Sequence, residues 1–181
     1  MQQPPALRPS FSFPLLVVVL GLPGTGKTTF ARMLAQRLGA LHFNTDIIRE
    51  ELGLKGQYGE VAKQRVYQSM EARARAALQK KQAVVVDGTF FKPALRKPYQ
   101  EMAAALGLPA CWIQLEASDA IVKERVAQKR KHSEADYSVY LRIRDAWAPL
   151  ETEHLKLSSE ESLETMVEKA LSFLQIQNSG P

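Results

Sequence analysis

Glycine, lysine and threonine residues between Gly21 and Thr28 follow the spacing G-x-x-x-x-G-K-T, in the sequence GLPGTGKT. Glycines at these positions permit a backbone turn whose successive N–H groups point inward at a phosphate. The lysine could reach the β- and γ-phosphates of a nucleotide, and the threonine hydroxyl could ligate Mg²⁺. The motif therefore predicts an ATP·Mg²⁺ site built from Gly21, Pro23, Gly24, Thr25, Gly26, Lys27, Thr28 and Thr29.

The residues on either side of the motif have the patterns that a phosphate-binding loop requires. Residues 15–20 form a continuous apolar run of the type found in parallel strands covered on both faces. Residues 27–38 have apolar side chains at helical spacing and are followed by Gly39, a natural helix stop. The positive end of that helix would add to the field at the phosphate. Lys27 has no packing role in this arrangement, so we expect it to face solvent when no nucleotide is bound.

Asp46 and Arg49 follow a short expected strand, residues 41–44, and lie three positions apart at the start of a helix. That spacing places both side chains on one helix face. In a doubly wound sheet, the loop that carries them opens on the same edge as the phosphate loop. The carboxylate could accept the proton of an attacking hydroxyl while the arginine holds an anion on the acceptor. A helix-capping aspartate beside an exposed arginine explains the same two residues equally well.

A third apolar run, residues 83–86, ends in Asp87-Gly88-Thr89. Apolar residues followed by an aspartate have the form of a Walker B strand, which places a carboxylate near the metal. We therefore expect Asp87 to assist Thr28 in holding Mg²⁺, through a water molecule rather than directly.

Arg125 and Arg130 lie towards the end of an expected helix, before the polar segment 132–136. A mobile basic segment that closes over the phosphates would neutralise the charge that develops during transfer and would exclude water. A solvated basic helix end, favoured by the helix dipole, is an interpretation of equal weight.

The remaining patterns alternate between strand and helix. One long helix is expected over residues 58–81, with an apolar stripe of Val61, Val66, Met70, Ala74, Ala77 and Leu78. The other expected elements are helices over 93–106, from 118 or 119 onwards, over 137–147 and from Ser159 to about 174, and strands over 110–115 and 154–158.

This alternation predicts one α/β domain with a parallel sheet. We assign residues 14–175 to that domain, with a lid at about 126–138. Residues 1–13 and 176–181 are assigned to flexible tails.

The overall composition suits a globular protein that binds an anion. The chain has 181 residues, of which 45% are hydrophobic, and a net charge of +5. This charge is compatible with ATP or nucleic acid, although a solvated basic surface is the simpler explanation. The single cysteine, Cys111, lies in an apolar stretch and is expected to be a buried, inert thiol. No apolar run approaches 18 residues, which argues against a membrane span and predicts a cytoplasmic protein.

Taken together, the motifs resemble those of the small P-loop kinases related to polynucleotide 5′-kinase, gluconate kinase and the zeta-toxin group, with an AAA-type ATP-binding domain in the broad sense. The chain is most similar to predicted ATP-dependent kinases that occur alone or fused to aminoglycoside-phosphotransferase-like domains. The resemblance covers nearly all of residues 15–174. It implies a P-loop NTPase fold: a three-layer sandwich with a five-stranded parallel sheet of order 2-3-1-4-5 and a small basic lid.

The resemblance also implies roles at the acceptor side of the site. Asp46 would be the general base, with Arg49 near the acceptor. An Asp-x-Thr element, here Asp87 and Thr89, and an arginine in the following helix, here Arg96, would also bind the acceptor.

In the lid, the resemblance implies that Arg125 acts on the transferred phosphoryl group. The second lid cation is either Lys129, four residues after Arg125, or Arg130, five residues after it. Polynucleotide kinases usually have Asn after the Asp-x-Thr element, whereas this chain has Phe90. That departure weakens a polynucleotide assignment.

We therefore expect a kinase that transfers the γ-phosphate of ATP to a hydroxyl of a small molecule or of a polynucleotide end. The alternative is an ATP-hydrolysing switch or regulatory ATPase, although the chain has no obvious arginine finger for a neighbour and no arm for ring assembly. A third hypothesis is a nucleic-acid-binding module, but no aromatic residues interleave with the basic ones to form a stacking platform. The motifs leave the identity of the acceptor and the oligomeric state open.

Overall fold

The computed structural model describes residues 14–127 and 137–178. In those ranges the strands are β1 (Leu16–Gly21), β2 (Leu41–Asn44), β3 (Val84–Gly88), β4 (Ala110–Glu116) and β5 (Leu155–Ser158). The helices are α1 (Lys27–Leu38), α2 (Thr45–Glu51), α3 (Glu60–Gln79), α4 (Pro93–Leu106), α5 (Asp119–Ala127), α6 (Tyr137–Asp145) and α7 (Leu163–Asn178). The expected N-terminal tail, most of the expected lid, and both Lys129 and Arg130 lie outside the described residues.

The strands form one parallel sheet with the order β2-β3-β1-β4-β5, which confirms the expected topology. Leu16 of the central strand β1 pairs with Val84 of β3 and with Ala110 of β4. Because neighbouring strands run in the same direction, their carboxyl ends meet at one edge of the sheet. The glycine-rich loop and Asp46 follow strand ends on that edge, and Asp87 lies in the last part of β3 at the same edge.

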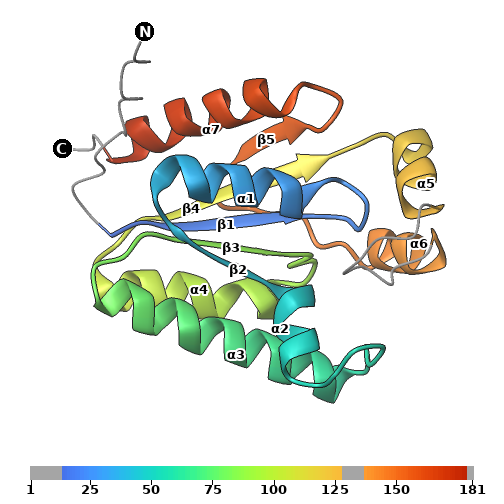
Figure 1. Ribbon diagram of the computed structural model, residues 1–181, viewed down its shortest axis with the longest axis horizontal. Coiled ribbons are helices and arrows are strands. Elements are labelled where there is room, and N and C mark those ends of the chain that lie inside the picture. The colour runs from blue at the N-terminus through green and yellow to red at the C-terminus, as the bar shows by residue number, and fades with distance from the viewer. Residues whose placement is uncertain (1–13, 128–136, 179–181) are drawn as a thin grey trace, which may run out of the picture.

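Helices cover both faces of the sheet, which gives the expected three-layer sandwich (Figure 1). Helices α1 and α7 lie on one face, and α3 and α4 lie on the other. Successive residues of β1 alternate between the two layers: Val17 and Val19 belong to the α1/α7 core, whereas Val18 and Leu20 belong to the α3/α4 core. Every residue of β1 is buried, as the continuous apolar run indicated.

The apolar stripe of α3 differs from the expected one at its first position. Val61 is 75% exposed, and Ala62 takes its place in the core. Ala62, Val66, Met70 and Ala74 are four residues apart and therefore share one helix face. Val61 is five residues before Val66, so its side chain points away from that face.

The remaining expectations concern reactivity and membrane contact. Cys111 is buried in β4, and burial raises the pKa of its thiol to about 12. The thiol is therefore protonated at neutral pH and inert, as expected.

No helix within the described ranges has the length and apolar character that crossing a membrane requires. Helix α7 continues past residue 175, the expected end of the domain, to Asn178.

Candidate active site

The glycine-rich loop connects β1 to α1 through backbone conformations that favour glycine. Gly24 has φ 84° and Gly26 has φ 87°, both in the left-handed region, and Gly26 is the N-cap of α1. A Cβ atom on Gly21 would lie 2.4 Å from the Leu115 carbonyl oxygen of β4. The loop can follow this path against the neighbouring strand only with glycine at these positions.

Lys27 departs from expectation because its side chain is already folded into the loop. It is 9% exposed, and its Nζ donates a hydrogen bond to the Leu22 carbonyl oxygen at 2.8 Å. The hydroxyl of Thr25 donates to the same carbonyl at 2.8 Å. A partly desolvated ammonium group needs an acceptor, and the Leu22 carbonyl across the loop supplies one. The expectation of a solvent-facing lysine was therefore wrong.

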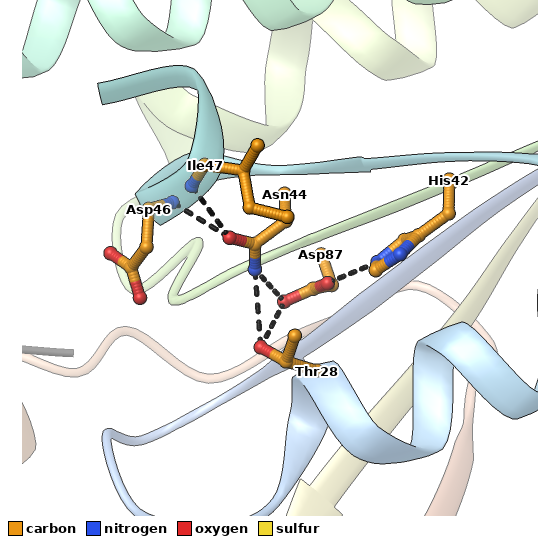
Figure 2. Close-up of polar contacts among 6 residues, drawn as sticks. All are labelled: Thr28, His42, Asn44, Asp46, Ile47 and Asp87. Carbon is orange, nitrogen blue, oxygen red and sulfur yellow. Dashed lines mark hydrogen bonds and ion pairs between the residues drawn. The ribbon is translucent and has the colours of Figure 1, made fainter. Parts of the chain in front are cut away.

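Asp87 is the centre of a buried polar cluster at the ends of β2 and β3 (Figure 2). Its Oδ1 accepts hydrogen bonds from Thr28 Oγ1 at 3.1 Å and from Asn44 Nδ2 at 2.7 Å. Its Oδ2 lies 2.5 Å from His42 Nε2. Asp87 is only 1% exposed, so these contacts fix the direction of its carboxylate.

The parallel register explains why His42 and Asn44 meet Asp87. Asn44 pairs with Asp87 across the β2–β3 ladder, so their side chains leave the same face of the sheet. His42 is two residues before Asn44 and shares that face. Neither residue was identified from the sequence as part of the site. The available signal was the spacing of two polar side chains, two residues apart in a strand and therefore on one face of the sheet.

The donor atoms of this cluster fit magnesium. A threonine hydroxyl and a carboxylate are hard oxygen ligands of the kind Mg²⁺ prefers, usually completed by nucleotide phosphates and water. The described residues hold no group of three or more His, Cys, Asp or Glu side chains able to bind a metal ion by themselves. An ion at Thr28 and Asp87 would therefore need the phosphates of a nucleotide as further ligands.

Asn44 rather than Asp46 caps helix α2. The Asn44 side-chain oxygen accepts from the backbone N–H groups of Asp46 and Ile47 at 2.9 and 3.0 Å. The capping explanation of Asp46 is thus excluded. In Figure 2 the Asp46 carboxylate is directed away from the Asp87 cluster, and its half-buried side chain lines the cleft described below.

Arg49 is likewise not the exposed arginine of the alternative interpretation, because it is only 7% exposed. Its NH1 donates to the Gln57 carbonyl oxygen at 2.6 Å, and its guanidinium lies 4.6 Å from the centre of the Tyr58 ring. Its Nε is buried and has no hydrogen-bond partner among the described residues. Asp46 and Arg49 therefore form part of one cleft wall.

The chain after β3 brings Thr89 into the cleft and turns Phe90 into the core. Phe90 has φ 47°, an unusual value for a residue with a side chain, and it is fully buried between the rings of Tyr67 and Tyr99. Tyr67 accepts a hydrogen bond from the Phe90 backbone N–H, and its hydroxyl lies 3.4 Å from Thr89 Oγ1. Phe90, which stands where polynucleotide kinases usually have Asn, therefore belongs to the hydrophobic core and does not line the acceptor side of the cleft.

Arg96 does not line the cleft. It is 3% exposed and donates to three backbone carbonyls, those of Phe90, Ala148 and Pro149, at distances between 2.5 and 2.9 Å. Burial lowers the pKa of its guanidinium. These bonds tie α4 to the β3 exit and to the segment after α6, so the structure gives Arg96 a place in the fold rather than at the acceptor.

Replacement of Arg96 by methionine should therefore mainly reduce stability. Methionine keeps an apolar stem but leaves one buried and two partly buried carbonyls without their donor, which should lower the free energy of unfolding by about 3 kcal/mol. Urea unfolding measures this loss. Lys97→Met, a change at a 72% exposed neighbour, should cost less than about 0.5 kcal/mol. Equal stability of the two variants, with loss of activity only in Arg96→Met, would instead restore the acceptor role.

Arg125 reaches from α5 to the outside of the phosphate loop. Its NH1 donates to Ser159 Oγ at 2.8 Å and its NH2 to the Ser159 carbonyl at 3.0 Å, while a longer contact of 3.4 Å joins NH1 to the Gly24 carbonyl. Ser159 therefore does not cap the last helix as expected. Ser162 has that position instead, because its hydroxyl accepts from the Thr165 backbone N–H at 3.1 Å.

One cleft of about 450 Å³ collects most of the expected site residues. Its walls come from the phosphate loop, the ends of β2 and β3, the first turns of α3 and one face of α6. The expected residues that line it are Pro23, Gly24, Gly26, Lys27, Thr28, Thr29, Asp46, Arg49, Asp87 and Thr89. Lining residues that the sequence did not indicate include Asn44, Tyr58, Glu60, Lys63, Tyr67, Lys92 and Arg142.

The chain matches the family model of an AAA domain over residues 16–150, more than half of its length. An uncharacterized protein of Mycobacterium tuberculosis (strain H37Rv) is 29% identical over 152 residues. That match covers 77% of this chain but only 30% of the relative, so the chain spans less than a third of that protein.

Solved structures of kinases share the fold. A sugar kinase from Janibacter sp. HTCC2649 has a TM-score of 0.73 and 19% identity, covering 92% of this chain and 97% of its own. A gluconokinase from Sinorhizobium meliloti 1021 has a TM-score of 0.71 and 18% identity, with 92% and 94% covered. The Mycobacterium tuberculosis APS kinase, solved in complex with AMPPNP and APS, has a TM-score of 0.71 and 14% identity, with 90% and 98% covered. The fold of this chain is therefore that of a P-loop kinase.

Proposed function

The chain belongs to the AAA domain family, and we propose that it is an ATP-dependent kinase that transfers the γ-phosphate of ATP to a hydroxyl group. One observation carries the proposal: a single cleft holds both the phosphate loop and a second wall with Asp46 and Arg49. A site that only hydrolyses ATP has no need of that second wall. The likeness to structures of a sugar kinase, a gluconokinase and an APS kinase supports the same reaction class.

In the proposed reaction, the loop and the Asp87 cluster hold the nucleotide. Backbone N–H groups of the loop and the start of α1 face the phosphates. The Lys27 ammonium exchanges the Leu22 carbonyl for phosphate oxygens. Thr28 and Asp87 provide oxygen donors for Mg²⁺, and His42 and Asn44 keep the Asp87 carboxylate in place. The chemistry that Mg²⁺ supplies when bound is neutralisation of the charge on the β- and γ-phosphates.

On the opposite wall, Asp46 accepts the proton of the attacking hydroxyl. Its backbone N–H, and not its carboxylate, takes part in the capping of α2. The attachment of α2 through Asn44 to Asp87 supports this role, because it holds the start of the helix at a fixed position relative to Asp87. Such positioning is the main contribution a protein makes to phosphoryl transfer.

Release of ADP with and without hydroxyl compounds tests this function against the alternative of an ATP-hydrolysing switch. The assay uses saturating ATP and Mg²⁺ and a pool of sugars, nucleosides and an oligonucleotide with a 5′-hydroxyl. A kinase should release ADP at least about tenfold faster with the pool than without it. The Lys27→Ala variant, purified in parallel, controls for contaminating enzymes. The same rate with and without the pool would favour the switch ATPase and contradict the kinase.

Arg125 provides a further prediction for the same reaction. We expect its guanidinium to leave Ser159 and stabilise the transferred phosphoryl group only in the transition state. Arg125→Ala should then lower kcat by about 10²–10³ with ATP affinity unchanged, and Arg125→Lys should recover little, because lysine lacks the planar pair of donors.

Ser159→Ala is the matched control for Arg125. It removes one hydrogen bond of the guanidinium in the present position but leaves the charge, so it should change kcat less than about threefold. Steady-state kinetics and ATP titration on these variants separate two roles. Weakened ATP binding with normal kcat in Arg125→Ala would mean that Arg125 only braces the phosphate loop.

A further inference from the structure

The cleft extends beyond the phosphate loop into a part that we call the acceptor end. It is lined by Arg49, Tyr58, Glu60, Lys63, Lys92 and Arg142. Four of these six side chains are cationic and one is acidic. The composition of this part of the wall therefore differs from that of a neutral sugar site, where uncharged polar groups would suffice.

Glu60, the acidic residue of this set, pairs with only one of the four cations. Glu60 Oε1 lies 2.7 Å from Lys63 Nζ. This hydrogen bond and the charge of Lys63 lower the pKa of Glu60, with a smaller contribution from Lys92, so Glu60 is ionised at neutral pH. Lys63 is thus paired, whereas Glu60 forms no ion pair with Arg49, Lys92 or Arg142.

These three cations have few other contacts. Arg49 uses NH1 for the Gln57 carbonyl, but its Nε is buried and lacks a partner among the described residues. Lys92 Nζ lies 5.4 Å from the centre of the Phe91 ring, a weak contact for an ammonium group. The side chain of Arg142 makes no hydrogen bond or ion pair with any part of the chain that the structure describes, whereas its backbone carbonyl accepts from the Ala146 N–H. A concave site with more cations than carboxylates attracts anions.

The helix that carries Arg142 is held in place by its neighbour. Val139, Arg142 and Ile143 are spaced three and four residues apart, and they turn one face of α6 to the cleft. The opposite face is anchored to α5, since the Tyr140 hydroxyl donates to Asp119 and Arg144 NH1 lies 3.0 Å from Asp119 Oδ2. The position of Arg142 is therefore set by the packing of α6.

We propose that the acceptor is a small alcohol bearing an anionic group, a phosphate, sulfate or carboxylate. Lys92 and Arg142 bind this group while the alcohol faces Asp46. The proposal rests on the proposed kinase function and adds the chemical class of its substrate. A cleft of about 450 Å³ suits a small molecule beside the reacting phosphates. The first phosphodiester of a polynucleotide end offers the same chemistry, and the experiment distinguishes the two sources.

The first arm measures binding without turnover. Inorganic sulfate is titrated by calorimetry into protein saturated with AMPPNP·Mg²⁺, which blocks the phosphate loop. Wild-type protein should bind sulfate saturably, and Lys92→Met and Arg142→Met should each weaken it about tenfold. Lys156→Met, at a 60% exposed position on β5, is the charge-matched control and should bind as wild type. No sulfate binding, or equal binding in all variants, would overturn the proposal.

The second arm compares two alcohols with their phosphate monoesters, in which one hydroxyl is esterified and the others stay free. Glucose is paired with glucose 6-phosphate, and adenosine with adenosine 3′-monophosphate, and acceptor-dependent ADP release is measured. The anionic member should have at least about tenfold higher kcat/KM, and Lys92→Met should remove the preference through KM. If a decanucleotide with a 5′-hydroxyl had a clearly higher kcat/KM than adenosine 3′-monophosphate, the acceptor would be a polynucleotide end, and the proposal of a small-molecule acceptor would be overturned.

Failure of this inference can be told from failure of the kinase function. Preference for the uncharged alcohols would overturn the anionic acceptor and leave the kinase intact. Sulfate binding that depends on Lys92 and Arg142, with ADP release indifferent to every alcohol, would support the anion site and contradict the kinase.

Discussion

Replacing Lys27 with alanine should abolish phosphotransfer while the chain stays folded. In the proposed reaction the ammonium group bridges the β- and γ-phosphates, and the backbone N–H groups of the loop cannot supply that charge. We expect kcat to fall by at least about 10³. Lys27→Met, which keeps the volume of the stem, should lose as much as Lys27→Ala, because the charge and not the packing is removed.

The structure explains why Lys27→Ala should not unfold the protein. Lys27 Nζ bonds to the Leu22 carbonyl, but that carbonyl also accepts from the Thr25 hydroxyl at 2.8 Å. It therefore keeps a donor in the variant, and the free energy of unfolding should fall by only about 1 kcal/mol. Urea unfolding checks this value alongside kinetics. Turnover near that of the wild type would contradict the assignment of the nucleotide site.

Asp46→Asn should lower kcat by about 10²–10⁴, the usual contribution of a positioned general base. Asparagine has almost the same shape but cannot accept a proton from the attacking hydroxyl. ATP affinity should be nearly unchanged, because Asp46 is not part of the phosphate loop and is assigned to the acceptor. The capping of α2 should also persist, since it uses the Asn44 side chain and the backbone of residue 46.

Glu50→Gln is the matched control for Asp46→Asn. Glu50 belongs to the same helix and is exposed, and it does not line the cleft. Its amide variant should keep wild-type kcat and ATP affinity. If Asp46→Asn weakened ATP binding but left turnover at saturation intact, Asp46 would belong to the nucleotide site and would not be the general base.

The order of strands and helices could be predicted from the sequence because it depends on local patterns. Residues 27–38 and 93–106 have helical spacing, and each is followed by a glycine that the structure places in the left-handed C-cap position. The apolar runs before Gly21 and Asp87 indicated buried parallel strands. The motif at Gly21–Thr28 predicted the phosphate loop because its conformation requires glycine at fixed positions.

The contacts of individual cations could not be predicted, because they join residues distant in the sequence. Arg96 and Arg125 were both interpreted as residues of the site. In the structure the Arg96 guanidinium bonds to the carbonyls of Ala148 and Pro149, and the Arg125 guanidinium bonds to Ser159. The sequence around these partners does not reveal the contacts, because most of the acceptors are backbone carbonyls, which every residue has.

The hydrogen-bond partner of Lys27 could not be predicted from the local sequence pattern either. Its sequence position indicated a ligand-binding role, but not that the loop carbonyl of Leu22 would accept a hydrogen bond from its ammonium group. The acceptor end was missed for a different reason. Lys63, Lys92 and Arg142 come from three separate elements, and only the packing of α3 and α6 beside the β3 exit brings them to one cleft.

The fate of the γ-phosphorus atom tests the proposed kinase most directly. The protein is incubated with ATP labelled with ³²P at the γ-position, Mg²⁺ and the pool of hydroxyl compounds, and the products are separated into inorganic phosphate and organic phosphate esters. A kinase should place most of the label in an ester, and the Lys27→Ala and Asp46→Asn variants should form little of it. Label recovered only as inorganic phosphate, at a rate that the pool does not change, would contradict phosphotransfer to a hydroxyl.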